Sequence, residues 1–300
     1  MEDSLKEKYM EIYIDFIGGD IAKSTRERKK SVVKRFLEYL DERKIEDITH
    51  FDVNVVYEYI DSMDYASATI SYIEFQLRQF FEAMFRAGVT DTCGRKVFPV
   101  INSDKRERLL SFYATEEIRD MVSSIPEDSL CYTRNKCMVL MAAQMGLRTG
   151  DILGLKFKEI KWDKDLIEKV QQKTGTRISV PLPENVKLIL IDYIKNHRPK
   201  SESENVFLKQ HDCEPFGSNI LYGIVSNAFH LANVEIGNRK HGGHALRHSF
   251  ATRLLRNDTP LPIITSILGH KNMNTTRQYL SISINELRKL ALEVPSYENH

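Results

Sequence analysis

The sequence predicts a mainly α-helical protein with a small β-hairpin or sheet, in which a helical N-terminal domain precedes an α+β C-terminal domain. Three observations predict this fold. Apolar residues recur at helical spacing through the first hundred positions, and no stretch before residue 98 alternates as a strand would. The stretch FPVINSDKRERLLSFYATEE has a charge cluster and no clear period. Two short segments, DLIEKVQQ and TRISVPLP, then read as strands around a Lys-Thr-Gly turn. The predicted boundaries are 1–100 for the N-terminal domain, 101–112 for the linker and 113–300 for the C-terminal domain.

The N-terminal domain is expected to contain four helices, over residues 5–16, 23–43, 52–63 and 67–88. The second helix has one apolar side, and basic residues crowd its first half. The fourth helix ends at a glycine, a residue that suits a helix C-cap because it adopts the left-handed conformation readily.

The C-terminal domain is expected to begin with a helix in TEEIRDMVSSI, whose acidic first turn complements the helix dipole. The next segment, RNKCMVLMAAQMG, is almost wholly apolar, so we expect a buried helix that ends at Gly146. After the hairpin, helical patterning returns and continues to the end of the chain.

Composition limits the setting but does not identify a partner. The 43 basic and 42 acidic residues give a net charge of +1, which neither supports nor excludes binding to nucleic acid. The four cysteines form no CxxC pair and have no zinc-ligand spacing, so a reduced, cytoplasmic setting is expected. The sequence shows no signal peptide and no apolar run long enough to span a bilayer.

Six polar residues lie at the edges of segments that are expected to be buried. Each has an ordinary structural interpretation when taken alone. An arginine near a helix end is usually a surface ion pair, a single histidine is more often a structural hydrogen bonder than a catalyst, and a tyrosine on an amphipathic helix usually belongs to the core. The six are Arg148 in MGLRTGDILGL, Lys173 in QQKTGT, His244 and Arg247 in HALRHSFATRLL, and His270 and Tyr279 in ILGHKNMNTTRQYL.

Taken together, these residues indicate chemistry at a phosphate. Arginine, lysine and histidine are cations or hydrogen-bond donors, so a pocket built from them suits a highly charged oxyanion such as a pentacoordinate phosphorane. Arginine is apt because its fork binds two phosphate oxygens at once. No acidic cluster is available to hold magnesium, so the guanidinium groups would replace the metal. Tyr279 would be the nucleophile, and its phenol, with a pKa of about 10, needs cationic surroundings or a base.

These segments resemble the tyrosine recombinase, or phage integrase, family. GLRTGDILGLKFKEI is similar to the first arginine motif of the family, and GGHALRHSFATRLL is similar to its His-x-x-Arg motif, especially in the Xer form. ILGHKNMNTTRQYL is similar to the Leu-Gly-His motif that precedes the nucleophilic tyrosine. Order and spacing agree, and the resemblance covers essentially the whole chain, because the N-terminal helices resemble the SAM-like core-binding domain of the family.

The resemblance implies a role for each residue. Tyr279 would attack a DNA phosphate to form a 3′-phosphotyrosyl link, and Lys173 would protonate the leaving 5′-oxygen, although Lys169 in the preceding strand is an alternative lysine. Asp151 fills the acidic position three residues after the first arginine and would brace the site, while His248 would be structural. The implied reaction requires no metal, no ATP and no other cofactor. The groups that stabilise the transition state would be Arg148, Arg247, His244 and His270.

The implied partner is double-stranded DNA that carries a specific recombination site, bound by a tetramer on two duplexes that exchanges strands through a Holliday junction. A last helix is expected from Ser283, with an apolar stripe that ends at Val294, and the family donates this helix to a neighbouring subunit. The alternative is that the stripe packs on its own domain. Expected DNA contacts lie on the second and fourth helices, and the alternative is that this basic face is merely solvated. These contacts are Thr25, Arg26, Lys29, Lys30, Thr69, Tyr72 and Arg78.

Two biological roles fit the resemblance. No extra N-terminal arm-binding domain is expected, which favours Xer-like resolution of chromosome or plasmid dimers, a role linked to chromosome partition and cell division. The Lys-Thr-Gly turn replaces the Gly-Lys-Gly turn usual in Xer proteins, and YLSIS replaces the usual Tyr-Thr-His sequence. The turn favours the alternative, an integrase or excisionase of a mobile element. Two further classes are a type IB topoisomerase and a DNA-binding protein that has lost catalysis.

Overall fold

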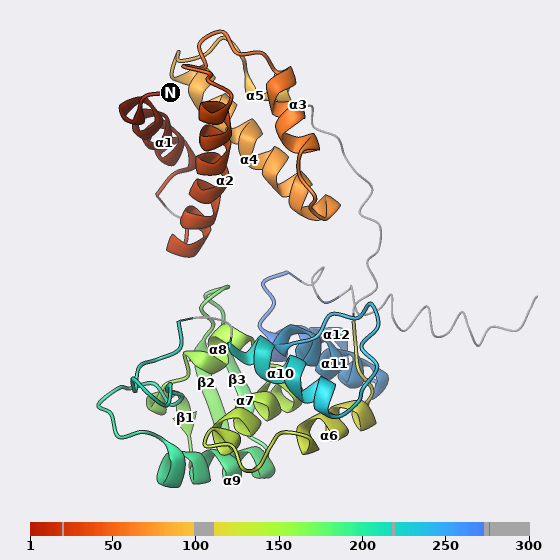
Figure 1. Ribbon diagram of the computed structural model, residues 1–300. Coiled ribbons are helices and arrows are strands. Elements are labelled where there is room, and N and C mark those ends of the chain that lie inside the picture. The colour runs from red at the N-terminus through yellow and green to blue at the C-terminus, as the bar shows by residue number, and fades with distance from the viewer. Residues whose placement is uncertain (20, 99–110, 218–219, 273–275, 277–300) are drawn as a thin grey trace, which may run out of the picture. The chain divides into compact units, whose positions relative to one another are not determined.

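The computed structural model describes residues 1–19, 21–98, 111–217, 220–272 and 276 (Figure 1). The chain divides into two compact units, residues 1–104 and 105–300, and each has its own hydrophobic core. In the part of the chain that is described, no helix is long and apolar enough to cross a membrane.

Unit 1 confirms the four helices predicted from periodicity. They are α1 (Asp3–Ile17), α2 (Lys23–Glu42), α3 (Asn54–Asp61) and α4 (Ser67–Arg86). A short helix that was not predicted, α5 (Gly94–Val97), packs against α4; four residues are too few to show a helical period.

The core of unit 1 is aromatic. The ring of Phe36, on α2, lies 5.2 Å from that of Tyr59 and 5.9 Å from that of Phe81, measured between centroids. Because such edge and tilted contacts add to the hydrophobic burial of large rings, α2, α3 and α4 are held together at one point.

α2 packs against α4, and side chains from the first half of α2 reach it. The guanidinium of Arg28 stands 4.3 Å from the centroid of the Tyr72 ring, and Lys29 Nζ donates to Gln79 Oε1 at 3.1 Å. Basic residues of α2 and polar residues of α4 therefore share one face of unit 1.

Unit 2 is built around α7 (Tyr132–Met145), which is buried along most of its length, as its apolar sequence predicts. It packs against helices that precede it and follow it in the unit. Its last turn is followed by Gly146, where the sequence predicts the end of the helix, and this glycine is a left-handed C-cap at φ +63°. The other helices are α6 (Thr115–Ser123), α8 (Thr149–Leu153), α9 (Glu184–Asp192), which continues into a π-helical turn (Tyr193–His197), α10 (Ile220–Leu231), α11 (Gly243–Arg256) and α12 (Leu261–Leu268).

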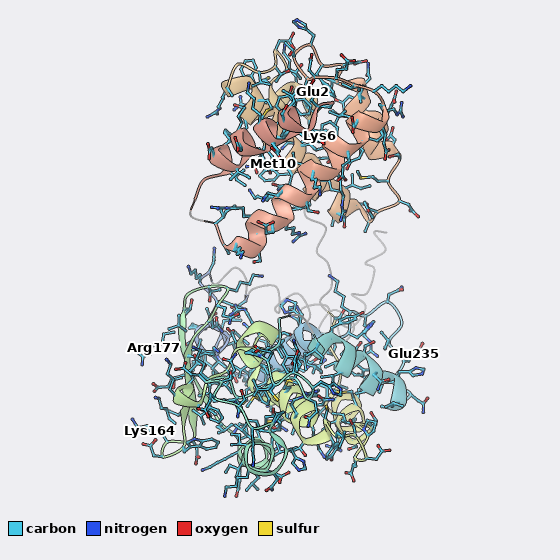
Figure 2. The ribbon with its side chains drawn as sticks, turned by 60° about the vertical axis from the view of Figure 1, so that its left-hand side comes forward. Glu2, Lys6, Met10, Lys164, Arg177 and Glu235 are labelled. Atoms are coloured by element: carbon cyan, nitrogen blue, oxygen red, sulfur yellow. The ribbon has the colours of Figure 1, made fainter. Side chains whose placement is uncertain are left out.

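The two predicted strands form a hairpin, and a third, two-residue strand extends it into an antiparallel sheet of order β1-β2-β3. The strands are β1 (Ile160–Lys161), β2 (Leu166–Val170) and β3 (Arg177–Pro181). In Figure 2, Arg177 at the start of β3 and Lys164 in the β1–β2 turn mark the two ends of this sheet. Alternation along β2 turns Ile167 and Lys169 to the buried face. The β2–β3 turn carries Lys173 at the end of the sheet nearest Arg177.

Candidate active site

The C-terminal ends of α7 and α12 meet in the candidate active site. Each ends in a glycine in the left-handed region, Gly146 at φ +63° and Gly269 at φ +61°. A Cβ atom at Gly146 would lie 2.5 Å from the Phe250 ring, and one at Gly269 would lie 2.4 Å from Gln171 Oε1. Glycine is therefore required at both positions by conformation and by close packing.

Arg247 lies between these two helix ends and is only 1% exposed. Its Nη1 donates to the Gly146 carbonyl oxygen at 2.5 Å, and its Nη2 donates to that of Leu268 at 2.6 Å. The last carbonyls of a helix lack intrahelical partners and carry the negative end of the helix dipole. They therefore stabilise a buried guanidinium, which remains charged at any physiological pH.

Arg148 is the N-cap of α8 and lies beside Arg247. Its Nη2 lies 3.5 Å from the Gly269 carbonyl oxygen, whereas Arg247 binds the preceding carbonyl, that of Leu268. Because the two guanidinium groups bind consecutive carbonyls, the end of α12 holds them side by side.

Gln171 fixes this arrangement and was not predicted from the sequence. It is 1% exposed, accepts hydrogen bonds from Arg148 Nη1 and from Thr174 Oγ1, and donates from Nε2 to the Leu268 carbonyl oxygen at 3.1 Å. It therefore connects the β2–β3 turn to α8 and α12. A signal for it was present, because the period of β2 places this amide on the same face as Ile167 and Lys169.

Asp151, in the first turn of α8, is 1% exposed. Its Oδ1 accepts the backbone N–H of Gln172 at 3.1 Å, and its Oδ2 has no hydrogen-bond partner within the described part of the chain. Burial raises the pKa of Asp151, while the bond from Gln172 and the nearby cations oppose that rise. The carboxyl group thus lies among the positive charges of the site.

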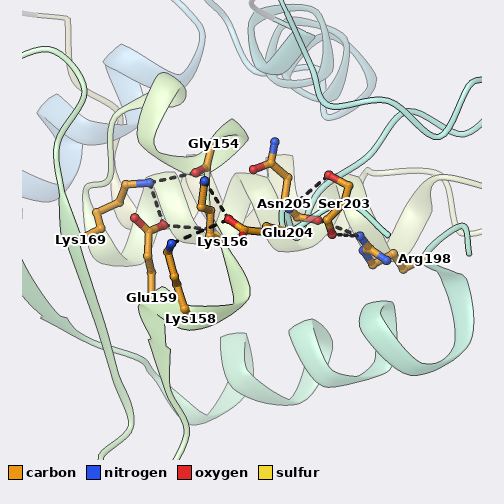
Figure 3. A network of polar contacts seen from close by, with 9 residues as sticks. All are labelled: Gly154, Lys156, Lys158, Glu159, Lys169, Arg198, Ser203, Glu204 and Asn205. Carbon is orange, nitrogen blue, oxygen red and sulfur yellow. Dashed lines mark hydrogen bonds and ion pairs between the residues drawn. The ribbon is translucent and has the colours of Figure 1, made fainter. Parts of the chain in front are cut away.

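The two candidate lysines have different surroundings. Lys169 is 4% exposed, and its Nζ donates to the carbonyl oxygen of Asp151 at 3.0 Å. It also donates to the carbonyl oxygen of Gly154 at 3.2 Å and to Glu159 Oε2 at 3.1 Å (Figure 3). An ammonium group has three N–H donors, so these bonds use all of them. Lys173, in contrast, is exposed on the β2–β3 turn, and its charge contributes to lowering the pKa of His244.

The three histidines of the site favour the neutral form. His244 lies in the first turn of α11 and keeps part of its surface exposed, and its ring centroid is 4.4 Å from that of His248. Desolvation lowers the pKa of His244, and the charge of Arg247 lowers it further. Burial, followed by neighbouring positive charges, lowers the pKa of His248 to about 3 and that of His270 to about 4.

A close approach of two helices brings His244 towards Arg148. A Cβ atom at Gly243 would lie 2.6 Å from Thr149 Oγ1, so only glycine lets the start of α11 come this near to the start of α8. The structure thus gathers Arg148, Asp151 and Arg247 with His270, and places His244 and Lys173 within electrostatic range. Tyr279 and the expected C-terminal helix lie outside the described residues.

The described residues include no group of three or more histidine, cysteine or acidic side chains that could hold a metal ion. The expected independence from metal stays a prediction.

The predicted DNA contacts of unit 1 differ in their surroundings. Arg26 donates to the Gly19 carbonyl oxygen at 3.0 Å, and Arg78 donates to that of Phe98 at 2.7 Å, so both guanidinium groups also bind backbone. Arg28, which was not predicted, covers the Tyr72 ring. The remaining positions lie on the first half of α2 or of α4, and their side chains are exposed or half-exposed. They are Thr25, Lys29, Lys30 and Thr69.

Residues 111–286 match the family model described as "Phage integrase family". The curated protein "Putative integrase/recombinase y4rA" of Sinorhizobium fredii is 30% identical over 224 residues, which cover 73% of this chain and 53% of that protein. The chain therefore spans about half the length of this relative. Tyrosine recombinase XerD of Staphylococcus epidermidis is 24% identical over 293 residues, which cover 94% of this chain and 96% of XerD.

Among solved structures, XerH site-specific recombinase bound to palindromic difH substrate, in a post-cleavage complex, matches with a TM-score of 0.72 and 18% identity. The match covers 89% of this chain and 78% of that chain. At this identity the likeness shows a shared fold, and it confirms the predicted fold class of helices with a small antiparallel sheet.

The contacts of Lys169 predict a structural role that Lys173 lacks. Lys169→Met should lower the free energy of unfolding by about 3 kcal/mol, because it leaves Glu159 without its buried partner. Lys173→Met, at an exposed position, should change it by less than about 0.5 kcal/mol. Urea unfolding at neutral pH measures both. The double variant Lys169→Met/Glu159→Gln should recover part of the loss, and equal stability of the two single variants would contradict the assignment.

The lowered histidine pKa values predict acid sensitivity. The folded-state pKa values of His248 and His270, about 3 and about 4, lie below the ordinary value of 6.5, so folding favours their neutral forms. Their contribution to stability is complete above pH 6.5 and is lost as pH falls towards 4 and 3. Each histidine adds at most about 1.4 kcal/mol per pH unit to the slope of the free energy of unfolding against pH. Urea unfolding between pH 7 and 5 should show a shallower slope in His248→Gln; an unchanged slope would contradict the prediction.

Proposed function

Because the chain belongs to the phage integrase family, we propose that it is a site-specific tyrosine recombinase that cuts and rejoins double-stranded DNA. The observation that carries this proposal is the pair of guanidinium groups, Arg148 and Arg247, held on consecutive carbonyls at the end of α12. Two fixed, permanently charged forks suit the equatorial oxygens of a phosphorane, and they need no reorganisation during the reaction.

In the proposed reaction, the phenolic oxygen of Tyr279 attacks a DNA phosphate and the 5′-oxygen leaves. The product is a 3′-phosphotyrosyl link, and a 5′-hydroxyl from a partner duplex then attacks it to exchange strands through a Holliday junction. The link conserves the bond energy, so neither ATP nor a metal takes part. Arg148 and Arg247, with His244 and His270, stabilise the transition state.

The environments of the histidines suit proton transfer from the nucleophile. A phenol must lose its proton when it attacks, and a neutral imidazole can accept a proton whereas an imidazolium cannot. The lowered pKa of His244 keeps its ring neutral at physiological pH, and part of that ring is exposed to a ligand.

Lys173 is the proposed general acid. The leaving 5′-oxygen needs a proton from a group that can reach it. The ammonium of Lys169 already binds three acceptors within unit 2, whereas Lys173 is exposed on a turn near His244. Asp151 braces the active site through its bond from the Gln172 N–H and its charge near the arginines, and His248 supports His244 through the contact between their rings.

The proposed partner is a duplex with a specific recombination site, contacted by unit 2 at the active site and by unit 1 through α2 and α4. We further propose assembly of four copies on two duplexes, in which the segment after Ser283 is donated to a neighbouring copy. The biological role proposed first is Xer-like resolution of chromosome or plasmid dimers in the cytoplasm, which the likeness to XerD over nearly the full length of both chains supports.

Integration or excision of a mobile element is the second candidate role, favoured by the Lys-Thr-Gly turn and by the likeness to y4rA. Mapping the genomic positions at which the protein becomes covalently attached to DNA separates the two roles. Attachment at one chromosomal locus supports dimer resolution, and attachment at the ends of an element supports integration.

The nucleophile is tested with a nicked suicide substrate that carries the mapped site. Wild-type protein should form an adduct that survives denaturing electrophoresis, and Tyr279→Phe should form none while it binds the site with unchanged affinity, because only the phenolic oxygen is lost. An adduct in the variant would exclude Tyr279. Relaxation of plasmids that lack the site, without recombination, would instead indicate a type IB topoisomerase, and absence of any wild-type adduct would indicate a binding protein.

Charge reversal tests the DNA-binding face of unit 1. Lys29→Glu/Lys30→Glu should weaken binding and reduce the slope of log affinity against log salt by about 0.9 for each phosphate contact that is lost. Reversal of two other exposed lysines, Lys8→Glu/Lys195→Glu, changes net charge equally and serves as the control. Gel shifts at several salt concentrations measure both effects. An unchanged slope in the first variant would remove this face from the interface.

A further inference from the structure

A chain of hydroxyl groups extends from His270 into the protein. The His270 ring lies between Arg247 Nη2, 3.1 Å from its Nε2, and Thr276 Oγ1, 2.8 Å from its Nδ1. Thr276 is fully buried, and its hydroxyl lies 2.9 Å from Thr265 Oγ1 on α12. Thr265 Oγ1 in turn lies 2.7 Å from the carbonyl oxygen of Leu261.

The proton positions along this series of hydrogen bonds can be assigned by counting donors. A guanidinium can only donate, so His270 Nε2 accepts from Arg247 and the ring proton lies on Nδ1. Nδ1 therefore donates to Thr276, Thr276 donates to Thr265, and Thr265 donates its single hydroxyl proton to Leu261. Every polar atom along the chain is satisfied, as buried polar groups require.

The same atoms also allow every hydrogen bond between His270 and Thr265 to run in the reverse direction. If Nε2 carries the proton, Nδ1 becomes an acceptor, Thr276 donates to it and Thr265 donates to Thr276. Hydroxyl groups make this reversal by rotating, whereas a carbonyl oxygen at either position could only accept.

We propose that Thr276 and Thr265 are positioning residues that let His270 exchange its two neutral tautomers. The inference rests on the proposed function. In the free protein Nδ1 holds the proton and Nε2 faces Arg247. When a phosphate occupies the site, Nε2 holds the proton and donates it as a hydrogen bond to a phosphate oxygen. One proton leaves Nδ1 for water and one is taken from water at Nε2, so the net charge does not change.

One further observation supports the inference. Burial and the charges of Arg247, Arg148 and His244 lower the pKa of His270 to about 4, so the neutral ring is the form present at physiological pH.

Cleavage of the suicide substrate at saturating DNA provides the first test. Thr276→Val removes the hydroxyl and keeps the shape, and it should slow cleavage roughly tenfold, the value of one ordinary hydrogen bond, without weakening DNA binding. Thr276→Ser should restore the rate, and Thr265→Val should slow it in the same direction. The matched control is Thr252→Val, since that buried hydroxyl has no hydrogen-bond partner among the residues described. Cleavage by Thr276→Val at the wild-type rate would overturn the inference.

The nitrogen-15 chemical shifts of His270 test the tautomers directly, with the signal assigned from a His270→Asn variant of the full chain. The free wild-type protein should show a protonated Nδ1, and addition of orthovanadate should move the proton to Nε2. Thr276→Ser should behave in the same way, whereas Thr276→Val should show a smaller change. A wild-type complex with both nitrogens protonated, or an unchanged response in Thr276→Val, would overturn the inference.

The two proposals fail in different ways. If the wild-type protein forms no adduct with DNA, the proposed function fails, while the orthovanadate spectra still decide the tautomer exchange. If the adduct forms and the threonine variants match the wild type, only the exchange fails. Thermal unfolding of Thr276→Val beside Thr276→Ser identifies any loss of rate that comes from loss of the fold.

Discussion

The structure of unit 2 depends on burying one positive charge. The guanidinium of Arg247 is almost wholly removed from water, and such a charge is strongly destabilising unless hydrogen-bonded groups replace the solvent. The carbonyls of Gly146 and Leu268 replace it, and both belong to helix ends with unpaired acceptors. This requirement brings α7 and α12 together end to end against α11. It also explains the tight glycines, since any side chain at Gly146 would separate the helix from the ring of Phe250.

The other groups of the site follow from this charge. Desolvation, followed by neighbouring positive charges that include Arg247, lowers the pKa values of His248 and His270 far below their ordinary range, so both rings are neutral at physiological pH. A carboxyl group at Asp151 can be buried nearby because three cations surround it. Lys169 then ties α8, which carries Asp151, to β2, since it binds the carbonyls of Asp151 and Gly154 as well as Glu159.

Sequence patterns predicted the elements that are long and periodic, including the four helices of unit 1 and the buried helix that ends at Gly146. They missed α5 and β1, because four and two residues are too short to show a period. Arg148, Arg247 and His270 could be found from their motifs, and the structure brings them into contact through α12. Gln171 and Thr276 belong to none of these motifs. The period of β2 marks Gln171 as facing inward, but the atoms that either side chain meets in three dimensions cannot be read from the sequence.

The choice between the two lysines shows what burial adds to a motif. Both side chains come from one hairpin, four residues apart, and both lie close to the first arginine motif in sequence. The period of β2 turns Lys169 inward, where an ammonium group must find three acceptors to be stable, and it finds them. A group bound in this way cannot give a proton to a ligand without losing its partners. Lys173 belongs to the turn, where no such demand is made, so its ammonium can reach a substrate that arrives from outside. The same physical rule that makes a buried lysine structural leaves the exposed one available for chemistry.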